Sequence, residues 1–424
     1  MTAKIWHPFT QHGLGEPIPE VVGAEGAVLY TEDGRTVIDA ISSWWVQTHG
    51  HCHPRIVSAI QEQSAKLDQV IFAGWTHEPA RQLAKGLSDF LPVGLDHIFF
   101  SDSGSTAVEV ALKMALGFWH NQGSSRNRIL VMDHSYHGDT IGAMSIGARG
   151  VFNKAYAPLL FDVGSIPFPE RGTEQAALNA LSAFCEDQDN PPAALIVEPL
   201  ILGAGGMKVY SPEILTEMYC ICRKHDVLFI ADEVMTGWGR TGTVFACEQA
   251  DIIPDILCMA KGLTGGVIPL ALTAASAPIY DAHFSKDRTK TFFHSSSFTA
   301  NPIACAAANA NLQIWRDEPV QQRIDHIIAR HRDFADELRQ YANISDVRQC
   351  GTILAFEIEG TGTNDGGGNY MSDLGPALLQ FFAERDVLLR PLGNSIYIMP
   401  PYCITNEQLS TIYLVITEAI DHFS

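Results

Sequence analysis

The sequence predicts an α/β protein with a mostly parallel central sheet and helices on both of its faces. Between about residues 60 and 310, short apolar runs alternate with helix-length segments. The runs are continuous rather than alternating, which is typical of strands buried on both faces and therefore of parallel sheets. Polar residues also stand where several of these runs end. The chain has 424 residues, which is long enough for two domains.

The apolar runs give the expected strands of this sheet. They are His97–Phe100, Arg128–Met132, Ala194–Glu198, Val227–Ile230 and Ile256–Met259. After about residue 315 the pattern changes, and we expect a long charged helix there. It is followed by a strand near 352–357, a helix near 374–384 and paired strands near 387–390 and 395–399. The last helix begins at Thr405–Gln408, a capping box.

This change in pattern predicts two domains. We expect a large domain over residues 60–315 and a smaller α/β domain formed by residues 1–59 together with 316–424. The glycine-rich segment Gly360–Gly368 has the composition of a flexible surface loop.

Composition excludes several classes of function. A formal net charge of -20 argues against nucleic acid or an anionic membrane as a partner. No apolar stretch is long enough to span a membrane, and the N-terminus has no apolar core of signal-peptide length. The nine cysteines are odd in number and scattered, which indicates reduced thiols and a cytoplasmic location.

A lysine and an aspartate stand at the ends of two of the predicted strands. Lys261 follows the run Ile256–Met259, and Asp232 ends the run that begins at Val227. The carboxyl ends of parallel strands meet at one edge of the sheet, where ligands bind. A lysine that bonds to an aldehyde and a carboxylate that keeps a pyridine nitrogen protonated are what a pyridoxal phosphate (PLP) enzyme requires. Tyr136 and Glu198 also follow predicted strands.

The segment Asp102–Thr106 is the candidate phosphate site. It lies between a predicted strand and a helix, and the free amides at a helix N-terminus bind anions. Gly104 permits close approach of the backbone to a ligand. The alternative is an ordinary helix cap, in which Thr106–Glu109 forms a capping box.

Three other motifs point to other chemistries. The segment His49–His53 has metal-ligating side chains, but histidines beside a proline in a loop are more often structural, and we expect no metal. Val227–Glu233 resembles a Walker B strand, which leaves an ATPase as an alternative, although the chain has no GxxxxGK[ST] loop. Gly203–Gly206 lacks the third glycine of a dinucleotide fingerprint, and no GxSxG elbow is present.

The motifs together resemble those of the class III PLP-dependent aminotransferases. The resemblance runs through essentially the whole chain and implies PLP as cofactor and the type I fold of PLP-dependent transferases. Its central signature is Ile230–Gly242, Pro254–Asp255 and Lys261–Gly266. Further matching segments are Ile5–Thr10, Ser42–Trp45, Ser101–Ser105, Tyr136–Asp139, Asn301–Pro302, Arg390–Gly393 and Tyr397–Tyr402.

The resemblance implies a role for each cofactor residue. Lys261 would bond to the cofactor and shuttle the proton, Asp232 would pair with the pyridine nitrogen and Tyr136 would stack on the ring. Gly104 and Ser105 would bind the phosphate. Ser297, where the family usually has Thr, would reach the phosphate across a homodimer interface. Ser296 would contact the cofactor and Ser295 the substrate, at positions where the family often has Gly-Pro.

The substrate-end motifs resemble those of family members that aminate 8-amino-7-oxononanoate in biotin synthesis. Arg390 would bind the acceptor's carboxylate, and Trp45, Tyr136 and Lys261 would contact the substrate. S-Adenosylmethionine is the expected amino donor, although Phe9 stands where its users commonly have Tyr and lysine users can have Phe. The alternatives are therefore the lysine-donor version, another ω-aminotransferase, or a PLP mutase or decarboxylase.

Overall fold

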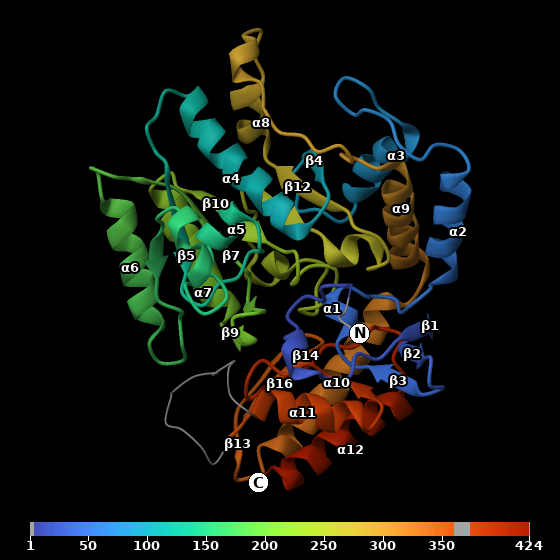
Figure 1. Cartoon of the computed structure of the whole chain (residues 1–424). Helices are drawn as coiled ribbons and strands as arrows, with labels where there is room; N and C mark the ends of the chain where they lie inside the picture. Colours follow the sequence, from blue (N-terminus) through green and yellow to red (C-terminus); the bar gives the residue numbers. More distant parts are fainter. Residues whose placement is uncertain (1–3, 360–373, 424) are drawn as a thin grey trace.

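The computed structural model describes residues 4–359 and 374–423 (Figure 1). Among these residues the strands form four sheets, of seven, four, three and two strands. The loop predicted at Gly360–Gly368 lies outside the described residues. No helix in the described ranges is both long enough and apolar enough to cross a membrane.

The largest sheet has the strand order β4-β12-β11-β10-β7-β5-β6. All its neighbouring pairs are parallel except those of β12, which is antiparallel to both β11 and β4. The mostly parallel sheet is therefore confirmed. Its strands are β4 (His97–Ser101), β5 (Arg128–Met132), β6 (Gly164–Ile166), β7 (Pro192–Val197), β10 (Leu228–Asp232), β11 (Ile256–Met259) and β12 (Ala271–Ala275).

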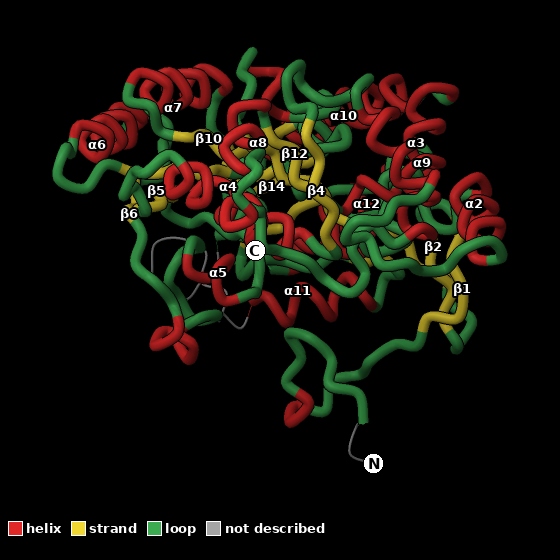
Figure 2. The backbone as a smooth tube through the Cα atoms, turned by 90° about the horizontal axis from the view of Figure 1, so that it is seen from above, coloured by secondary structure: helices red, strands yellow, loops and turns green. Residues whose placement is uncertain are grey.

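Both faces of this sheet are covered, which explains why its strands are apolar throughout. In β5, Ile129 and Val131 pack with the buried side of helix α4 (Gly104–Asn121). Their neighbours Leu130 and Met132 point to the opposite face and join the cluster that contains helices α6 (Glu174–Glu186) and α7 (Pro212–Lys224). Seen from above, the strands of this sheet are enclosed by helices (Figure 2).

The four-stranded sheet joins the two ends of the chain. β1 (Val21–Glu25), β2 (Val28–Thr31) and β3 (Thr36–Asp39) form antiparallel pairs, and β15 (Val387–Leu388) adds to β3 in parallel. Figure 1 accordingly shows the blue N-terminal strands beside the red C-terminal elements. β13 (Ile344–Cys350), β14 (Ile353–Ile358) and β16 (Ser395–Ile398) form another sheet, and β8 (Ile201–Leu202) pairs with β9 (Lys208–Val209).

The pairing predicted between residues 387–390 and 395–399 is wrong. β15 pairs with β3 and β16 pairs with β14, because both strands find partners far away in the sequence. The capping box at Thr405 is confirmed. The division into domains at residues 59/60 and 315/316 stays a prediction.

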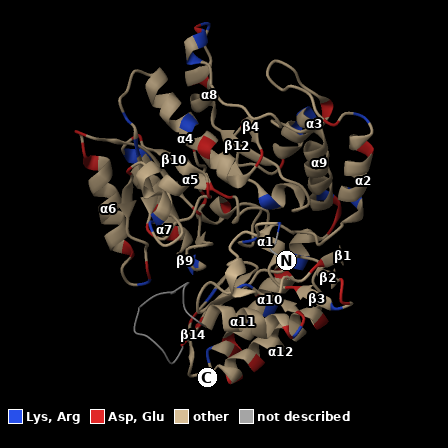
Figure 3. Cartoon of the chain, in the orientation of Figure 1, with Lys and Arg blue, Asp and Glu red and all other residues tan. Residues whose placement is uncertain are grey.

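The helices cover the sheets. Lys, Arg, Asp and Glu are scattered over the chain (Figure 3). The α-helices are α1 (Ser42–Trp45), α2 (Pro54–Ser64), α3 (Glu78–Leu87), α4 (Gly104–Asn121), α5 (Ile141–Ser145), α6 (Glu174–Glu186), α7 (Pro212–Lys224), α8 (Ala277–His283), α9 (Pro302–Asp317), α10 (Val320–Leu338), α11 (Leu374–Ala383) and α12 (Asn406–His422). The 3-10 segments are η1 (His12–Leu14), η2 (Lys154–Leu159), η3 (Ala246–Ala250), η4 (Lys261–Thr264) and η5 (Arg288–Lys290).

Candidate active site

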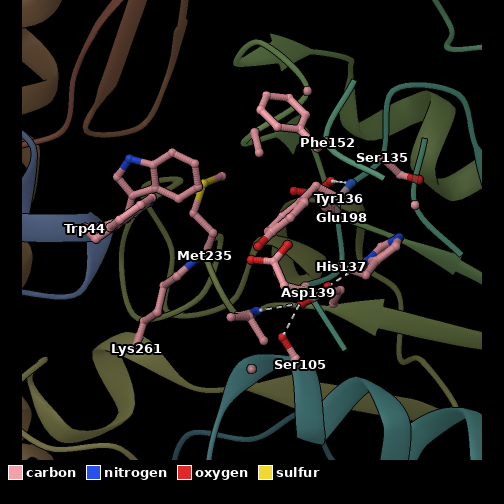
Figure 4. Close-up of a pocket in the computed structure, with 18 of the residues that line it drawn as sticks. Trp44, Ser105, Ser135, Tyr136, His137, Asp139, Phe152, Glu198, Met235 and Lys261 are labelled. Carbon is pink, nitrogen blue, oxygen red and sulfur yellow. Dashed lines mark hydrogen bonds and ion pairs between the residues drawn. The ribbon is translucent and has the colours of Figure 1, made fainter. Parts of the chain in front are cut away.

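A cavity of about 1360 Å³ opens at the carboxyl ends of the parallel strands. The segments that follow β4, β5, β10 and β11 line it, together with residues 8–9, 44–46 and 390–397. In Figure 4, Lys261 and Trp44 lie on one side of the cavity, while Tyr136, Glu198 and Asp139 lie on the other. The ligand site predicted at this edge of the sheet therefore coincides with a cavity, and its size accommodates a small-molecule ligand.

Lys261 begins the turn η4 directly after β11. Its backbone has a positive φ of 43°, which is uncommon for a residue other than glycine. The buried Asn311 supports this turn, because its Nδ2 donates to the carbonyl oxygens of Gly262 (3.1 Å) and Leu263 (3.0 Å). His49 Nε2 in turn donates to Asn311 Oδ1 at 2.7 Å. The turn that presents the lysine is thus fixed from α9.

Burial lowers the pKa of Lys261 from its ordinary 10.5 to about 8, since desolvation disfavours the ammonium form. The negative charges of Asp232 and Glu198 act in the opposite direction. Lys261 Nζ also lies 4.9 Å from the ring centroid of Trp45. The neutral, nucleophilic form of the amine is consequently a larger fraction near neutral pH than in an ordinary lysine.

We expect Lys261 in the cofactor-free protein to react with an amine-directed electrophile with a pH midpoint near 8. The neutral amine predominates above its pKa, so lowering the pKa moves the reactive range downward. Mass spectrometry of the Lys261 peptide across a pH series measures this midpoint. Asp232→Asn removes a charge that raises the pKa, so its midpoint should fall further. A midpoint near 10 in the parent protein would contradict the assignment.

Asp232 ends β10 and is buried, with 4% of its surface exposed. Its Oδ2 accepts a hydrogen bond from His137 Nδ1 at 2.7 Å, and its Oδ1 accepts from the amide of Val234 at 3.1 Å. These two donors fix the orientation of the carboxylate. Asp232 and Lys261 line the same cavity, as the sequence predicted.

Glu198 fixes the backbone beneath Tyr136. Its Oε1 accepts from the amide of Tyr136 and its Oε2 from the amide of Gly203, both at 2.9 Å. Burial raises the pKa of Glu198 to about 7, and the nearby Asp232 adds to that rise. Burial also raises the pKa of Tyr136 above its usual range. The Tyr136 ring is therefore a neutral, partly exposed surface in the cavity.

The N-terminus of α4 forms a cradle with the segment after β5. Ser103 caps the helix and Thr106 completes the capping box, so the predicted alternative box at Thr106–Glu109 is wrong. A Cβ on Gly104 would come within 2.6 Å of Val234 Cγ1, and one on Gly138 would collide with Ser105 Oγ. Ser105 Oγ also accepts from the amide of Asp139 at 3.2 Å. This cradle of small residues and helix amides suits a phosphate group.

Arg390 lines the cavity beside Trp44. Its guanidinium is 5.5 Å from the ring centroid of Trp44 and forms no ion pair with any described residue. Trp45 is buried, and its Nε1 donates to Tyr397 Oη at 2.9 Å. The positive charge of Arg390 is therefore available to a ligand carboxylate.

Ser295, Ser296 and Ser297 do not line this cavity. They lie between η5 and α9, and the carbonyl oxygen of Ser297 accepts from Gln69 Nε2 at 2.7 Å. The contact of Ser297 with the phosphate across a subunit interface stays a prediction, as do the cofactor contact of Ser296 and the substrate contact of Ser295.

Sequence reasoning missed two residues that hold the site. His137 and Asn311 orient the aspartate and the lysine turn through buried hydrogen bonds. The one feature of the sequence that could have indicated Asn311 is its position as a polar residue on the apolar face of a helix. The histidines of the predicted His49–His53 motif bond instead to Asn311, Asp39 and Glu318.

The model of the aminotransferase class-III family matches residues 12–420. The chain belongs to the class III aminotransferase family. Two similar curated proteins are named adenosylmethionine-8-amino-7-oxononanoate aminotransferase. The one from Synechococcus elongatus is 46% identical over 98% of each chain. The one from Geobacter sulfurreducens is 38% identical over 96% of this chain and 93% of its own.

Solved structures of class III aminotransferases share the fold. A structure of adenosylmethionine-8-amino-7-oxononanoate aminotransferase from Methanocaldococcus jannaschii has a TM-score of 0.94 and 32% identity, covering 99% of this chain and 97% of its own. A PLP-bound amine transaminase from an uncultivated Pseudomonas species has a TM-score of 0.92 and 27% identity over the full length of both chains. The predicted fold of PLP-dependent transferases, type I, is confirmed.

Proposed function

We propose that this class III aminotransferase transfers an amino group from S-adenosyl-L-methionine to 8-amino-7-oxononanoate. The product is 7,8-diaminononanoate, an intermediate of biotin synthesis. The observation that carries the proposal is a single cavity lined by Lys261, Asp232 and Arg390 in a chain 46% identical to a relative named for this reaction.

The residues of the cavity fit PLP as the cofactor. The α4 cradle at Gly104 and Ser105 would hold the phosphate, and Asp232 would pair with the pyridine nitrogen. Tyr136 offers its ring as a stacking surface. When bound, PLP supplies an aldehyde and an electron-withdrawing ring, through which an amino group is taken from the donor and given to the acceptor.

Lys261 is proposed to carry both covalent attachment and proton transfer. Its amine is neutral above about pH 8, so it acts as a base toward the α-proton of the donor and returns that proton afterwards. The buried Trp45 ring lies beside Nζ and covers one side of the amine. The Asn311 contacts hold the turn in place while the side chain moves.

Arg390 is proposed to bind the carboxylate of the acceptor. Trp45 and Tyr136 would enclose the aliphatic chain between this carboxylate and the ketone. In this proposed orientation the charged end of the acceptor would lie at Arg390 and its ketone would point toward Lys261.

Arg390→Ala is expected to raise KM for the acceptor by about 30-fold or more, because a charge-assisted hydrogen bond contributes about 2 kcal/mol. The rate of amino transfer from the donor should change little, since the donor half-reaction precedes acceptor binding. Steady-state kinetics with each substrate varied separates the two effects. Arg390→Lys keeps the charge without the planar guanidinium. Its KM for the acceptor should therefore lie between those of the parent protein and Arg390→Ala. Equal losses in the donor and the acceptor half-reactions would contradict the assignment of Arg390 to the acceptor's carboxylate.

The second candidate is the same amino transfer with lysine as donor. Phe9 favours it, because the cavity has a ring without a hydroxyl at this position. Phe9 packs 5.6 Å from the Trp44 ring and 6.0 Å from the Phe152 ring.

Donor profiling distinguishes the two candidates. Purified protein with bound PLP is mixed with 8-amino-7-oxononanoate and either S-adenosylmethionine or lysine, and 7,8-diaminononanoate is measured by mass spectrometry. Product with S-adenosylmethionine supports the proposal, and product with lysine alone overturns it in favour of the second candidate. Amination of general ketones without amination of the oxononanoate would indicate another ω-aminotransferase.

We also propose that the active form is a homodimer in the cytoplasm. Gln69 and Ser297 are hydrogen bonded, and the nearby Ile71, Trp75 and Phe298 are 64%, 67% and 61% exposed. Large exposed apolar side chains that lie close together are typical of subunit interfaces. All nine cysteines are free thiols, as expected in a reducing compartment.

A further inference from the structure

The segment that carries Trp44 and Trp45 has an unusual backbone. Ser42, Ser43 and Trp45 have positive φ values of 55°, 61° and 66°. Residues other than glycine rarely adopt this region, and such conformations persist only where the surrounding structure holds them. Something outside the segment must therefore fix it.

Asp39, at the end of β3, holds this segment. Its side chain is completely buried and does not line the cavity. Asp39 Oδ1 accepts from the amide of Ile41 at 3.2 Å, and Oδ2 accepts from the amide of Ser43 at 2.6 Å and from His51 Nε2 at 2.8 Å. A second tie is the hydrogen bond from Ser42 Oγ to the carbonyl oxygen of Met399 at 2.7 Å.

The backbone held in this way determines where two rings stand. The Trp45 ring lies 4.9 Å from Lys261 Nζ, and the Trp44 ring lies 5.5 Å from the guanidinium of Arg390. One strained segment therefore sets the aromatic surface beside both the proposed reacting amine and the proposed carboxylate site. A shift of the segment moves both rings together.

We propose that Asp39 is a positioning residue for amino transfer. It fixes the Trp44–Trp45 wall through the amides of Ile41 and Ser43 and touches neither cofactor nor substrate. Because the wall bounds the substrate space, loss of Asp39 affects substrate binding more than proton transfer at Lys261. The inference rests on the proposed function only in taking this cavity as the substrate site.

Asp39→Asn tests the proposal with little change in volume. One carboxylate oxygen is replaced by an NH₂ group that donates. If this group takes the place of Oδ2, both Ser43 and His51 lose their acceptor, and if it takes the place of Oδ1, Ile41 loses its acceptor. We expect KM for both substrates to rise about tenfold, since small displacements of positioned groups are costly, while kcat falls less. The pH midpoint of Lys261 modification should stay near 8. A crystal structure of the cofactor-free variant should show Ser43 and the two rings displaced.

Two further variants keep the test decisive. His51→Gln leaves the Asp39 carboxylate in place, so it should raise KM by less than Asp39→Asn does. This variant also tests the contact if Asp39→Asn proves unstable. Asp33→Asn, in the turn between β2 and β3, is the matched control and should leave KM unchanged. An Asp39→Asn protein that is folded, loaded with PLP and unchanged in KM would overturn the proposal. The assay uses whichever donor the parent protein accepts, so failure of S-adenosylmethionine alone rejects the proposed function and not the role of Asp39.

Discussion

Lys261→Ala is expected to lose amino transfer by about 10⁴-fold or more, because one amine serves as both covalent partner and proton carrier. The variant should still fold, because the Lys261 side chain lies at the cavity wall and its Nζ forms no hydrogen bond with any described residue. The turn around it is held by Asn311 rather than by the lysine side chain. Product formation under single-turnover conditions, with circular dichroism as the check on folding, measures the loss.

Lys208 is the matched control for this result. It lines the same cavity, but its Nζ pairs with Glu170 at 3.1 Å. Surface ion pairs of this kind contribute little to stability, so Lys208→Ala should keep its activity within about threefold. Comparable losses in both lysine variants would mean that charge in the cavity, rather than the chemistry of Lys261, accounts for the effect.

Asp232→Asn should reduce kcat by about a thousandfold, which corresponds to about 4 kcal/mol of transition-state stabilisation. The amide has nearly the same size as the carboxylate, but it has no negative charge to keep the pyridine nitrogen of PLP protonated. It also places its NH₂ group or its oxygen against His137 Nδ1, where the carboxylate now accepts at 2.7 Å. Steady-state kinetics at saturating PLP measures the loss separately from weaker cofactor binding.

Asp255→Asn is the control for Asp232→Asn. Asp255 directly precedes β11, which pairs in parallel with β10, so it lies at the opposite end of the strands from Asp232. Its Oδ2 accepts from the amide of Phe229 at 2.8 Å and its Oδ1 from Arg223 at 3.0 Å. Asp255→Asn should therefore lower the melting temperature and leave kcat within about twofold, because its effect is on packing far from the cavity. A large fall in kcat for this variant would undermine the interpretation of Asp232.

Local sequence patterns predicted the main sheet because its strands are buried on both faces. Such strands are apolar at every position, so the runs at 128–132 and 256–259 coincide with β5 and β11. The same rule placed Lys261 and Asp232 at one edge, since parallel strands end together. The short run Ala271–Ala275 was not predicted as a strand, because its alanines and threonine indicate helix as readily as strand.

Long-range pairing could not be predicted in the same way. β15 and β3 are separated by most of the chain, and nothing within residues 387–390 specifies that partner. The supports at Asn311 and His137 depend on tertiary contacts between elements far apart in the sequence. The expected roles of Arg390 and Ser297 came from the family resemblance, because an isolated arginine or serine has many ordinary roles.

The most direct test of the account is to locate the covalent attachment of the cofactor. Purified protein loaded with PLP is reduced with borohydride, which fixes the cofactor to the lysine that holds it, and peptides are mapped by mass spectrometry. We predict the modification on Lys261, with loss of labelling in Lys261→Ala. Labelling of another lysine in the parent protein, or bound PLP that borohydride does not fix to the chain, would contradict the central claim.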